Sequence, residues 1–167
     1  MSVQSDGSVR HEVVVDLPIE EAFAVFTDLD RIKPREHNML AVPIERTVLE
    51  QHVGGSVYDR GTDGSVCRWG RVLAFDPPTV IAFSWDIGPD WQIASDLDQT
   101  SEVEIKFFPE GDQRTRVTLV HRHIDWHGTG WGSLRDGLDA PDGWPLYLGR
   151  YEAMTRGELE ASWPSQT

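Results

Sequence analysis

Residues 13–23 read VVVDLPIEEAF, and this short stretch changes from a strand pattern to a helix pattern. Residues 9–15, which overlap the start of this stretch, alternate between two faces, as the side chains of a strand do. Pro18 is expected to open the helix, because the first turn needs no amide hydrogen from it, and Glu20 and Glu21 favour the positive helix end. The sequence therefore predicts a strand that leads directly into an amphipathic helix.

Beyond this opening the sequence predicts a second short helix that starts at residues 28–30 and is interrupted by Pro34. Short alternating segments follow, separated by turn signals such as Asp63-Gly64 and the double proline at 77–78. This arrangement is typical of an antiparallel meander. Its strands are predicted over residues 44–50, 56–60, 66–75, 80–85, 101–109 and 114–124.

The C-terminal part predicts two longer loops and a final helix. The loops cover residues 86–100 and 126–141, and both contain Trp with Gly or Pro, so we expect ordered flaps. Asp142 is the predicted N-cap of a long helix with Pro145 in its first turn, and residues 163–164 are expected to close the ordered part. Because an apolar sheet face needs a cover and the last helix is available for it, the predicted class is α+β, with an antiparallel sheet packed on the terminal helix. If the sheet curves around that helix, a cavity can form between them.

The composition limits the partners. A chain of 167 residues fits a single domain. The formal net charge is −13, from 15 basic and 28 acidic residues, and a surface of that sign repels phosphate backbones and anionic headgroups. No apolar run approaches the ~20 residues of a membrane span. We therefore expect neither nucleic acid nor a membrane as a partner, and a homodimer is left open.

Cys67 is the single cysteine, so no intrachain disulfide can form. Residues 1–7 have neither the basic start nor the apolar segment of a signal peptide. Both observations favour a reducing compartment, and the predicted location is the cytoplasm.

Strand alternation predicts a pocket beside the terminal helix. Apolar and aromatic side chains recur on one face of the predicted strands and on one stripe of the helix. The same side chains would also build a solid core, so both interpretations stay open for each of them. The residues predicted to line the pocket are Trp69, Leu73, Phe83, Trp85, Ile105, Phe107, Leu119, His121, His123, Trp144, Tyr147, Leu148 and Tyr151.

His121 and His123 are the polar pair on that face, and with Asp125 and His127 they form a His-x-His-x-Asp-x-His run. Imidazole and carboxylate groups bind zinc and similar ions, although this spacing is not diagnostic of a metal site. The alternatives are hydrogen-bonded histidines of the pocket or core, which we favour, and a proton carrier near neutral pH. We predict no metal, no cofactor and no catalytic residue.

Several stretches resemble the SRPBCC (START-like) superfamily. Residues 13–23 are similar to its strand-to-helix opening. Residues 69–78 (WGRVLAFDPP) and 83–85 (FSW) resemble the central hairpin of one branch, which groups bacterial proteins with the C-terminal domain of the activator of the heat-shock-protein-90 ATPase. Residues 143–145 (GWP) fit this branch as well. Members often carry a Trp-Trp pair after the first helices, where residues 34–40 read PREHNML here.

The resemblance spans about residues 9–161 and implies a helix-grip fold, in which a curved antiparallel sheet of about six to seven strands wraps around a long C-terminal helix and leaves a cavity. The superfamily shares no catalytic motif. The leading hypothesis is a module that binds a small hydrophobic or aromatic molecule between the sheet and the C-terminal helix, driven by apolar burial. The second hypothesis, implied by polyketide cyclases and aromatases, is an enzyme in which His121 and His123 move a proton with help from Tyr147. The third is a chaperone regulator, which rests on the resemblance alone and is the least favoured.

Overall fold

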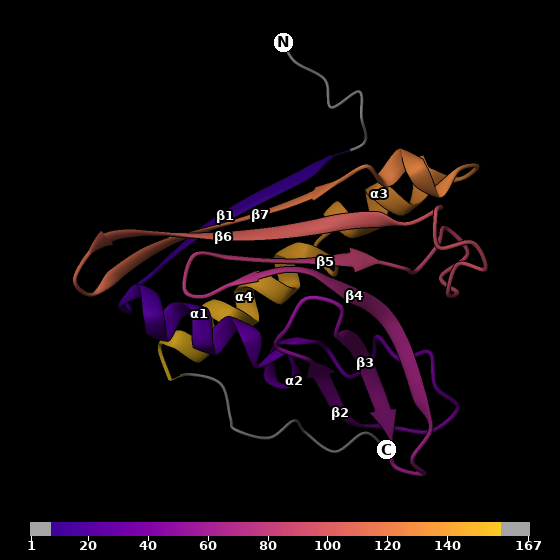
Figure 1. Cartoon of the computed structure of the whole chain (residues 1–167), viewed down its shortest axis with the longest axis horizontal. Coiled ribbons are helices and arrows are strands. Elements are labelled where there is room, and N and C mark those ends of the chain that lie inside the picture. The colour runs from indigo at the N-terminus through magenta and orange to yellow at the C-terminus, as the bar shows by residue number, and fades with distance from the viewer. Residues whose placement is uncertain (1–7, 158–167) are drawn as a thin grey trace.

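The computed structural model describes residues 8–157. Two short helices follow the first strand, six more strands come next, and helical segments end the described chain (Figure 1). The elements are β1 (Val9–Val15), α1 (Ile19–Thr27), α2 (Leu29–Ile32), β2 (Ile44–Leu49), β3 (Ser56–Gly61), β4 (Val66–Asp76), β5 (Val80–Trp85), β6 (Ser101–Gly111), β7 (Arg114–Arg122), η1 (Ile124–His127), α3 (Trp131–Asp139) and α4 (Trp144–Thr155).

The strands form one antiparallel sheet in the order β1-β7-β6-β5-β4-β3-β2. Strands β2 to β7 pair with their chain neighbours, whereas β1 joins the sheet beside β7, with Val9 opposite His121. The sheet curves, and α4 lies across its inner side (Figure 1). This architecture confirms the predicted α+β helix-grip class. Within residues 8–157 no helix is long and apolar enough to cross a membrane.

The predicted strands are all present, but two predictions near the C-terminus are wrong. Residues 126–141 were expected to be a loop, yet they contain the second half of η1 and the whole of α3. Gly143, not Asp142, occupies the cap of α4, and a Cβ at Gly143 would lie 2.2 Å from the Leu138 carbonyl oxygen. The chain can therefore turn tightly from α3 into α4 only because residue 143 has no side chain. The expected ordering at 158–161 and 163–164 lies outside the described residues.

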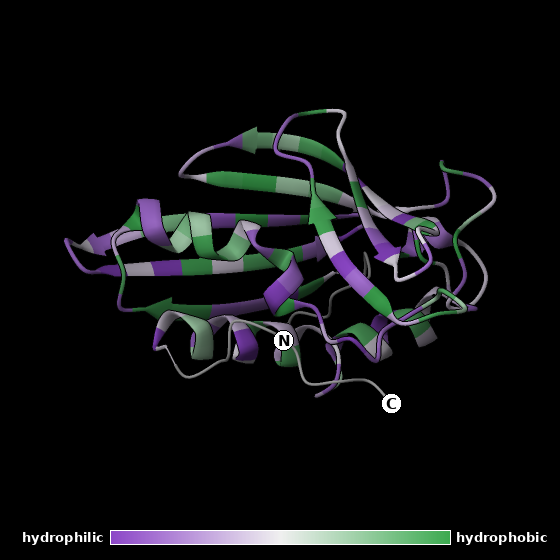
Figure 2. Ribbon diagram, turned by 90° about the horizontal axis from the view of Figure 1, so that it is seen from below, coloured by the Kyte–Doolittle hydropathy of each residue, from purple (hydrophilic) through white to green (hydrophobic). Residues whose placement is uncertain are grey.

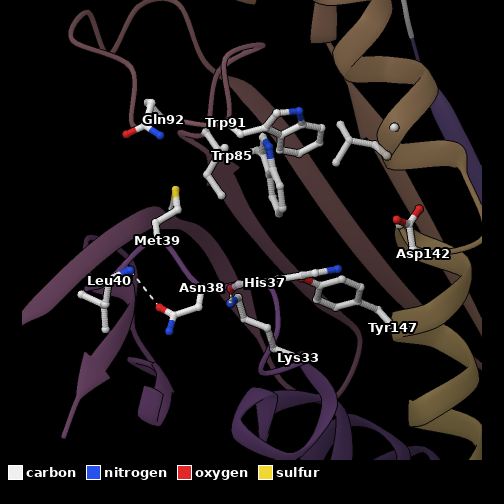
Figure 3. Close-up of a pocket in the computed structure, with 14 residues that line it drawn as sticks. Lys33, His37, Asn38, Met39, Leu40, Trp85, Trp91, Gln92, Asp142 and Tyr147 are labelled. Carbon is white, nitrogen blue, oxygen red and sulfur yellow. Dashed lines mark hydrogen bonds between the residues drawn. The ribbon is translucent and has the colours of Figure 1, made fainter. Parts of the chain in front are cut away.

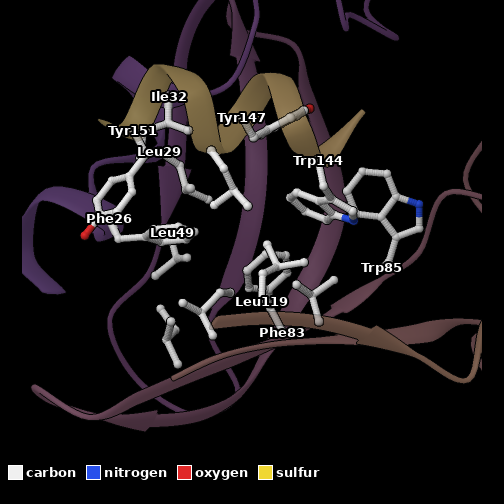
Figure 4. Packing of buried hydrophobic residues seen from close by; sticks show 14 of the residues in the cluster. Phe26, Leu29, Ile32, Leu49, Phe83, Trp85, Leu119, Trp144, Tyr147 and Tyr151 are labelled. Carbon is white, nitrogen blue, oxygen red and sulfur yellow. The ribbon is translucent and has the colours of Figure 1, made fainter. Parts of the chain in front are cut away.

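The space between α4 and the middle of the sheet is filled by the hydrophobic core (Figure 4). Tyr151 packs edge-on against Phe26, with ring centroids 5.0 Å apart, and its hydroxyl donates to the Ala22 carbonyl at 2.8 Å. Phe107 packs against Phe23 from the sheet side. Helix α4 is thus fixed to both α1 and the sheet, and the core here is solid.

Two register shifts in β4 change which side chains face inward. Trp69 is the extra residue opposite the Val57–Tyr58 step of β3, and Leu73 is the extra residue between the pairs Val72–Phe83 and Ala74–Ala82. A bulge of this kind breaks the two-residue alternation of a strand. Leu73 consequently lies on the outer face and is 40% exposed, so its predicted place in the pocket is wrong. Figure 2 shows the hydropathy along the strands.

Candidate ligand-binding cavity

A cavity of about 560 Å³ lies between the curved sheet and the start of α4. Three segments enclose it together with β5 and α4: the stretch after α2, the loop after β5, and the turn between α3 and α4. Its lining residues are Lys33, His37, Asn38, Met39, Leu40, Trp85, Ile87, Trp91, Gln92, Gly137, Leu138, Asp142, Gly143 and Tyr147 (Figure 3). The volume falls within the range of about 300–1,000 Å³ that is usual for small-molecule sites.

Two tryptophans form one side of the cavity. Trp85, at the end of β5, is held by edge-on contacts with Trp69 and Trp144, with ring centroids 5.5 Å and 5.4 Å apart. Trp91 comes from the following loop, has a left-handed φ of 60° and is 47% exposed. A Cβ at Gly137 would lie 2.9 Å from the Trp91 ring, so this indole reaches across to α3. On this side of the cavity, Trp85 is therefore fixed by its ring contacts, whereas Trp91 is carried by a loop.

The opposite side of the cavity is polar and contains His37 and Tyr147 (Figure 3). The His37 Nδ1 atom and the Tyr147 hydroxyl are 3.0 Å apart. Burial, and next the charge of Lys33, lower the pKa of His37, while burial raises the pKa of Tyr147 well above its ordinary range. Near neutral pH the pair is therefore an uncharged imidazole beside a protonated phenol.

Lys33 lies beneath this pair and is almost completely buried. Its Nζ atom is 3.0 Å from Oδ2 of Asp59 and also donates to the His37 carbonyl oxygen. Asp59 accepts a second hydrogen bond, at 2.7 Å, from the Thr47 hydroxyl. Burial lowers the pKa of the Lys33 ammonium, and the Asp59 carboxylate opposes that effect. A charged pair of this kind is rare inside a protein unless each partner is satisfied.

Two of the residues predicted to line a pocket, Trp85 and Tyr147, line this cavity. Most of the others belong to the solid core, because the cavity lies at the end of α4 and not along its length. These buried residues are Trp69, Phe83, Ile105, Phe107, Leu119, His121, Trp144, Leu148 and Tyr151.

His121 takes part in a buried hydrogen-bond chain. The Trp144 indole nitrogen, which can only donate, lies 3.0 Å from His121 Nδ1. Burial lowers the pKa of His121 to about 3, so the ring is neutral and its Nε2–H donates to Ser101 Oγ at 2.7 Å. The Ser101 hydroxyl can then donate to His127 Nε2, 2.8 Å away. This is the hydrogen-bonded core histidine of the favoured interpretation, and it does not face the cavity.

His123 does not share the inward face with His121. Strand β7 ends at Arg122, and His123 has a left-handed φ of 64°. Its ring stacks on the exposed Trp126, with centroids 3.9 Å apart and an interplanar angle of 4°. The predicted pocket role of His123 is therefore wrong, because the chain leaves the strand before this residue. Within residues 8–157 no group of three His, Cys, Asp or Glu side chains is arranged to hold a metal ion.

Sequence reasoning missed most of the cavity, because most of its remaining lining residues come from irregular segments; Gly137 and Leu138 come from α3, which was predicted as part of a loop. His37 and Met39 lie within residues 34–40, where the sequence lacks the Trp-Trp pair of the family that it resembles. Trp91 lies in the predicted flap of residues 86–100. The presence of Trp, Gly and Pro in residues 86–100 was the available signal for that flap. Nothing in the pattern around His37 indicated that it would meet a tyrosine of the last helix.

The fold defines a helix-grip protein, with a cavity beside the start of its C-terminal helix. Residues 16–156 match the family described as activator of Hsp90 ATPase homolog 1-like protein, and the chain belongs to this family. A comparison with curated proteins gives no match.

Several solved structures are similar to this chain. The anthrahydroquino-gamma-pyrone synthase Txn09 is 36% identical, with a TM-score of 0.60, and the match covers 87% of this chain and 94% of that one. CalC from Micromonospora echinospora, a self-sacrificing resistance protein, is 26% identical, with a TM-score of 0.63 and coverage of 94% and 99%. Protein NE0264 from Nitrosomonas europaea is 14% identical, with a TM-score of 0.66 and coverage of 93% and 98%, which shows the fold alone.

Proposed function

We propose that the cavity binds a planar aromatic molecule of the fused-ring phenol or quinone class. The observation that carries this proposal is the pair of indoles, Trp85 and Trp91, on one side of a 560 Å³ space that is polar on the other. Flat rings bury a large area against indoles, and a few polar groups then fix their orientation. The name of the 36% identical synthase, which refers to an anthrahydroquinone, supports the same ligand class.

The direct test is a binding titration with a panel of hydroxyanthraquinones, followed by isothermal calorimetry and native mass spectrometry. We expect one ligand per chain. Failure of every fused-ring phenol and quinone in the panel to bind would contradict the proposal.

Trp91 gives the first prediction. Replacing it by alanine removes the loop-borne wall, and we expect binding of the best hydroxyanthraquinone to weaken about tenfold, or ~1.4 kcal/mol. Trp126→Ala is a matched control, because Trp126 is also 47% exposed but does not line the cavity. Equal affinities of the two variants would show that Trp91 does not contact the ligand.

A second candidate function is ring closure of a bound phenol, and the His37–Tyr147 pair favours it. Proton transfer at one point needs at least two polar groups within reach, and this pair meets that condition whereas His121 and His123 do not. In such a reaction a phenol oxygen bonds to a side-chain carbonyl carbon of the ligand. The phenol O–H bond breaks as this bond forms, its proton goes to solvent, and the pair protonates the carbonyl oxygen to a hydroxyl. The hydroxyl then leaves as water with one further proton, while the neighbouring CH2 loses a proton, which returns to the pair, and its C–H electron pair becomes the ring double bond, so that one water is lost overall. The product is a fused pyrone.

Tyr147→Phe tests this candidate. With an ortho-hydroxyaryl 1,3-diketone as substrate, we expect the rate of pyrone formation to fall by about 10²- to 10⁴-fold, because the phenol O–H is lost, while substrate affinity changes only a few-fold. Tyr58→Phe is the control, since Tyr58 lies on β3 and does not line the cavity. Pyrone formation at the same rate in Tyr147→Phe would exclude this mechanism.

The chaperone-regulator hypothesis, the cytoplasmic location and the homodimer stay predictions. A pull-down with the intact chain that recovers a heat-shock-protein-90 chaperone would favour the first of them over ligand binding.

A further inference from the structure

The chain contains two lysines, and they have opposite surroundings. Lys106 lies on β6 with its side chain 47% exposed, whereas the Lys33 side chain is 4% exposed and lines the cavity. Burying an ammonium group is costly, and an apolar residue of similar length would fill the same space without that cost. The position of this charge therefore needs a reason other than packing.

The side-chain partner of Lys33, Asp59, does not line the cavity, and neither does Thr47. Asp59 and Thr47 lie on β3 and β2, and the His37 carbonyl takes a second hydrogen. An ammonium has three hydrogens, so one is left after these two partners. The Trp69 ring, 5.8 Å away, is the remaining neighbour on the core side. In Figure 3 the Lys33 side chain ends beside His37 and Asn38, on the cavity side.

Hydrogen-bond donors also line the cavity near Lys33. The Tyr147 hydroxyl is protonated, and His37 in its neutral form also carries one N–H. On the opposite, aromatic side, the Trp85 indole nitrogen is buried and has no hydrogen-bond partner within residues 8–157. The carboxylate of the lining set, Asp142, lies on the far side beyond Tyr147 (Figure 3). An oxygen atom that carries negative charge is the group that such a set of donors best accommodates.

We propose that the cavity holds its aromatic ligand as an oxyanion, with an ionised phenol oxygen placed against Lys33 Nζ. This inference rests on the proposed function and specifies the ionic form of the ligand. On binding, the phenol O–H bond breaks, its proton goes to the buffer, and the electron pair stays on the oxygen. Asp59 keeps Lys33 charged from behind, so the cation is available in front although the chain as a whole carries a net charge of −13.

Other charged groups near the cavity also affect the ionisation of this ligand oxygen. Asp59 and Cys67 from the sheet raise the pKa of Lys33, and Arg35 from the stretch after α2 lowers it. Glu36 and Asp142 raise the pKa of His37 and oppose an anion. Because Lys33 is the one Lys or Arg among the residues that line the cavity, we expect its effect to exceed theirs.

The test uses alizarin, a hydroxyanthraquinone dye whose colour reports its ionisation. Absorption spectra of the dye, free and bound to the intact protein, are recorded as a function of pH. We expect the bound dye to ionise at a pH lower by about one unit or more, because a cation within hydrogen-bond distance favours the charged form. A bound dye that ionises at the same or a higher pH would overturn this inference and leave the proposed function standing. A dye that does not bind would count against both.

Variants assign the shift to Lys33. Lys33→Met combined with Asp59→Asn removes both buried charges together, so no charge is left unpaired, and the downward shift should disappear. Lys106→Met is the matched control and should keep the full shift. If the double variant keeps the shift as well, Lys33 is not its source and the inference is wrong.

A second readout needs no variant in the cavity. Protein labelled with ¹³C at the lysine Cε positions gives two lysine signals, which Lys106→Met assigns. An anion beside Lys33 must stabilise the ammonium in return, so the Lys33 signal should titrate at higher pH with dye bound than without it. An unchanged Lys33 titration in the dye complex would contradict the contact even if the double variant does not fold.

Discussion

Acidification from about pH 6.5 to about pH 4 is expected to remove about 3 kcal/mol of folding free energy through His121 alone. Burial lowers the pKa of this ring to about 3 in the folded protein, whereas the unfolded chain has the ordinary value of about 6.5. Between these values the unfolded state binds more protons, so stability is complete above about pH 6.5 and is lost as the pH falls. Urea unfolding at a series of pH values measures this slope, which reaches about 1.4 kcal/mol per pH unit.

His121→Gln separates this effect from the other titrating groups. A glutamine amide can accept from the Trp144 indole and donate to Ser101, as the neutral imidazole does, but it takes up no proton. Burial also lowers the pKa of His37 and His127, so part of the slope will remain in the variant. His52→Gln, at an exposed position, should leave the slope unchanged. Identical slopes for wild type and His121→Gln would show that His121 is not the main acid-sensitive group.

The second large effect is expected from the Lys33–Asp59 pair. Lys33→Met leaves the Asp59 carboxylate buried with only the Thr47 hydroxyl as a hydrogen-bonded neighbour, and we expect the free energy of unfolding to fall by about 3–5 kcal/mol. Adding Asp59→Asn removes the unpaired charge, so the double variant should be more stable than Lys33→Met. Urea midpoints and slopes of the three proteins give these values.

Lys106→Met is the control for this series. Its ion pair with Glu104 is 3.7 Å long and exposed, so the expected loss is below about 1 kcal/mol. If Lys33→Met unfolds at the same urea concentration as the wild type, the Lys33–Asp59 contact does not contribute to stability and this prediction is wrong.

The regular part of the molecule could be predicted from local patterns. Alternation defines β1 and β5 at their observed bounds, and turn signals such as Asp63-Gly64 separate the neighbouring strands. These features depend on a few consecutive residues, so a single sequence contains them. The family resemblance then supplied the curvature of the sheet around the terminal helix.

The errors have equally local causes. Alternation assumes a constant phase, and the bulge at Leu73 shifts that phase without any Gly or Pro signal at the site. Beyond Arg122 the chain turns through the left-handed conformation of His123, which is not a glycine and gives no turn signal. Such changes of direction depend on packing against η1 and α3, which the sequence pattern does not show.

The cavity illustrates a different limit. Its polar side joins His37, from a stretch without periodicity, to Tyr147, from the last helix. Contacts between residues so far apart in the chain depend on how the sheet curves, and the hydropathy pattern of the sequence does not predict that curvature. Trp85 and Tyr147 were predicted because they also belong to regular elements.

The place of β1 in the sheet has a consequence for the order of assembly. During synthesis β1 is made first, but its partner β7 is made after every other strand, since Val9 pairs with His121. The hairpins from β2 to β7 close over connections of at most 15 residues, whereas the β1–β7 ladder joins residues about 100 positions apart, such as Val15 and Thr115, and carries the largest entropic cost. Contacts of such long range slow folding. The nascent chain must therefore keep its first strand unpaired until β7 has left the ribosome.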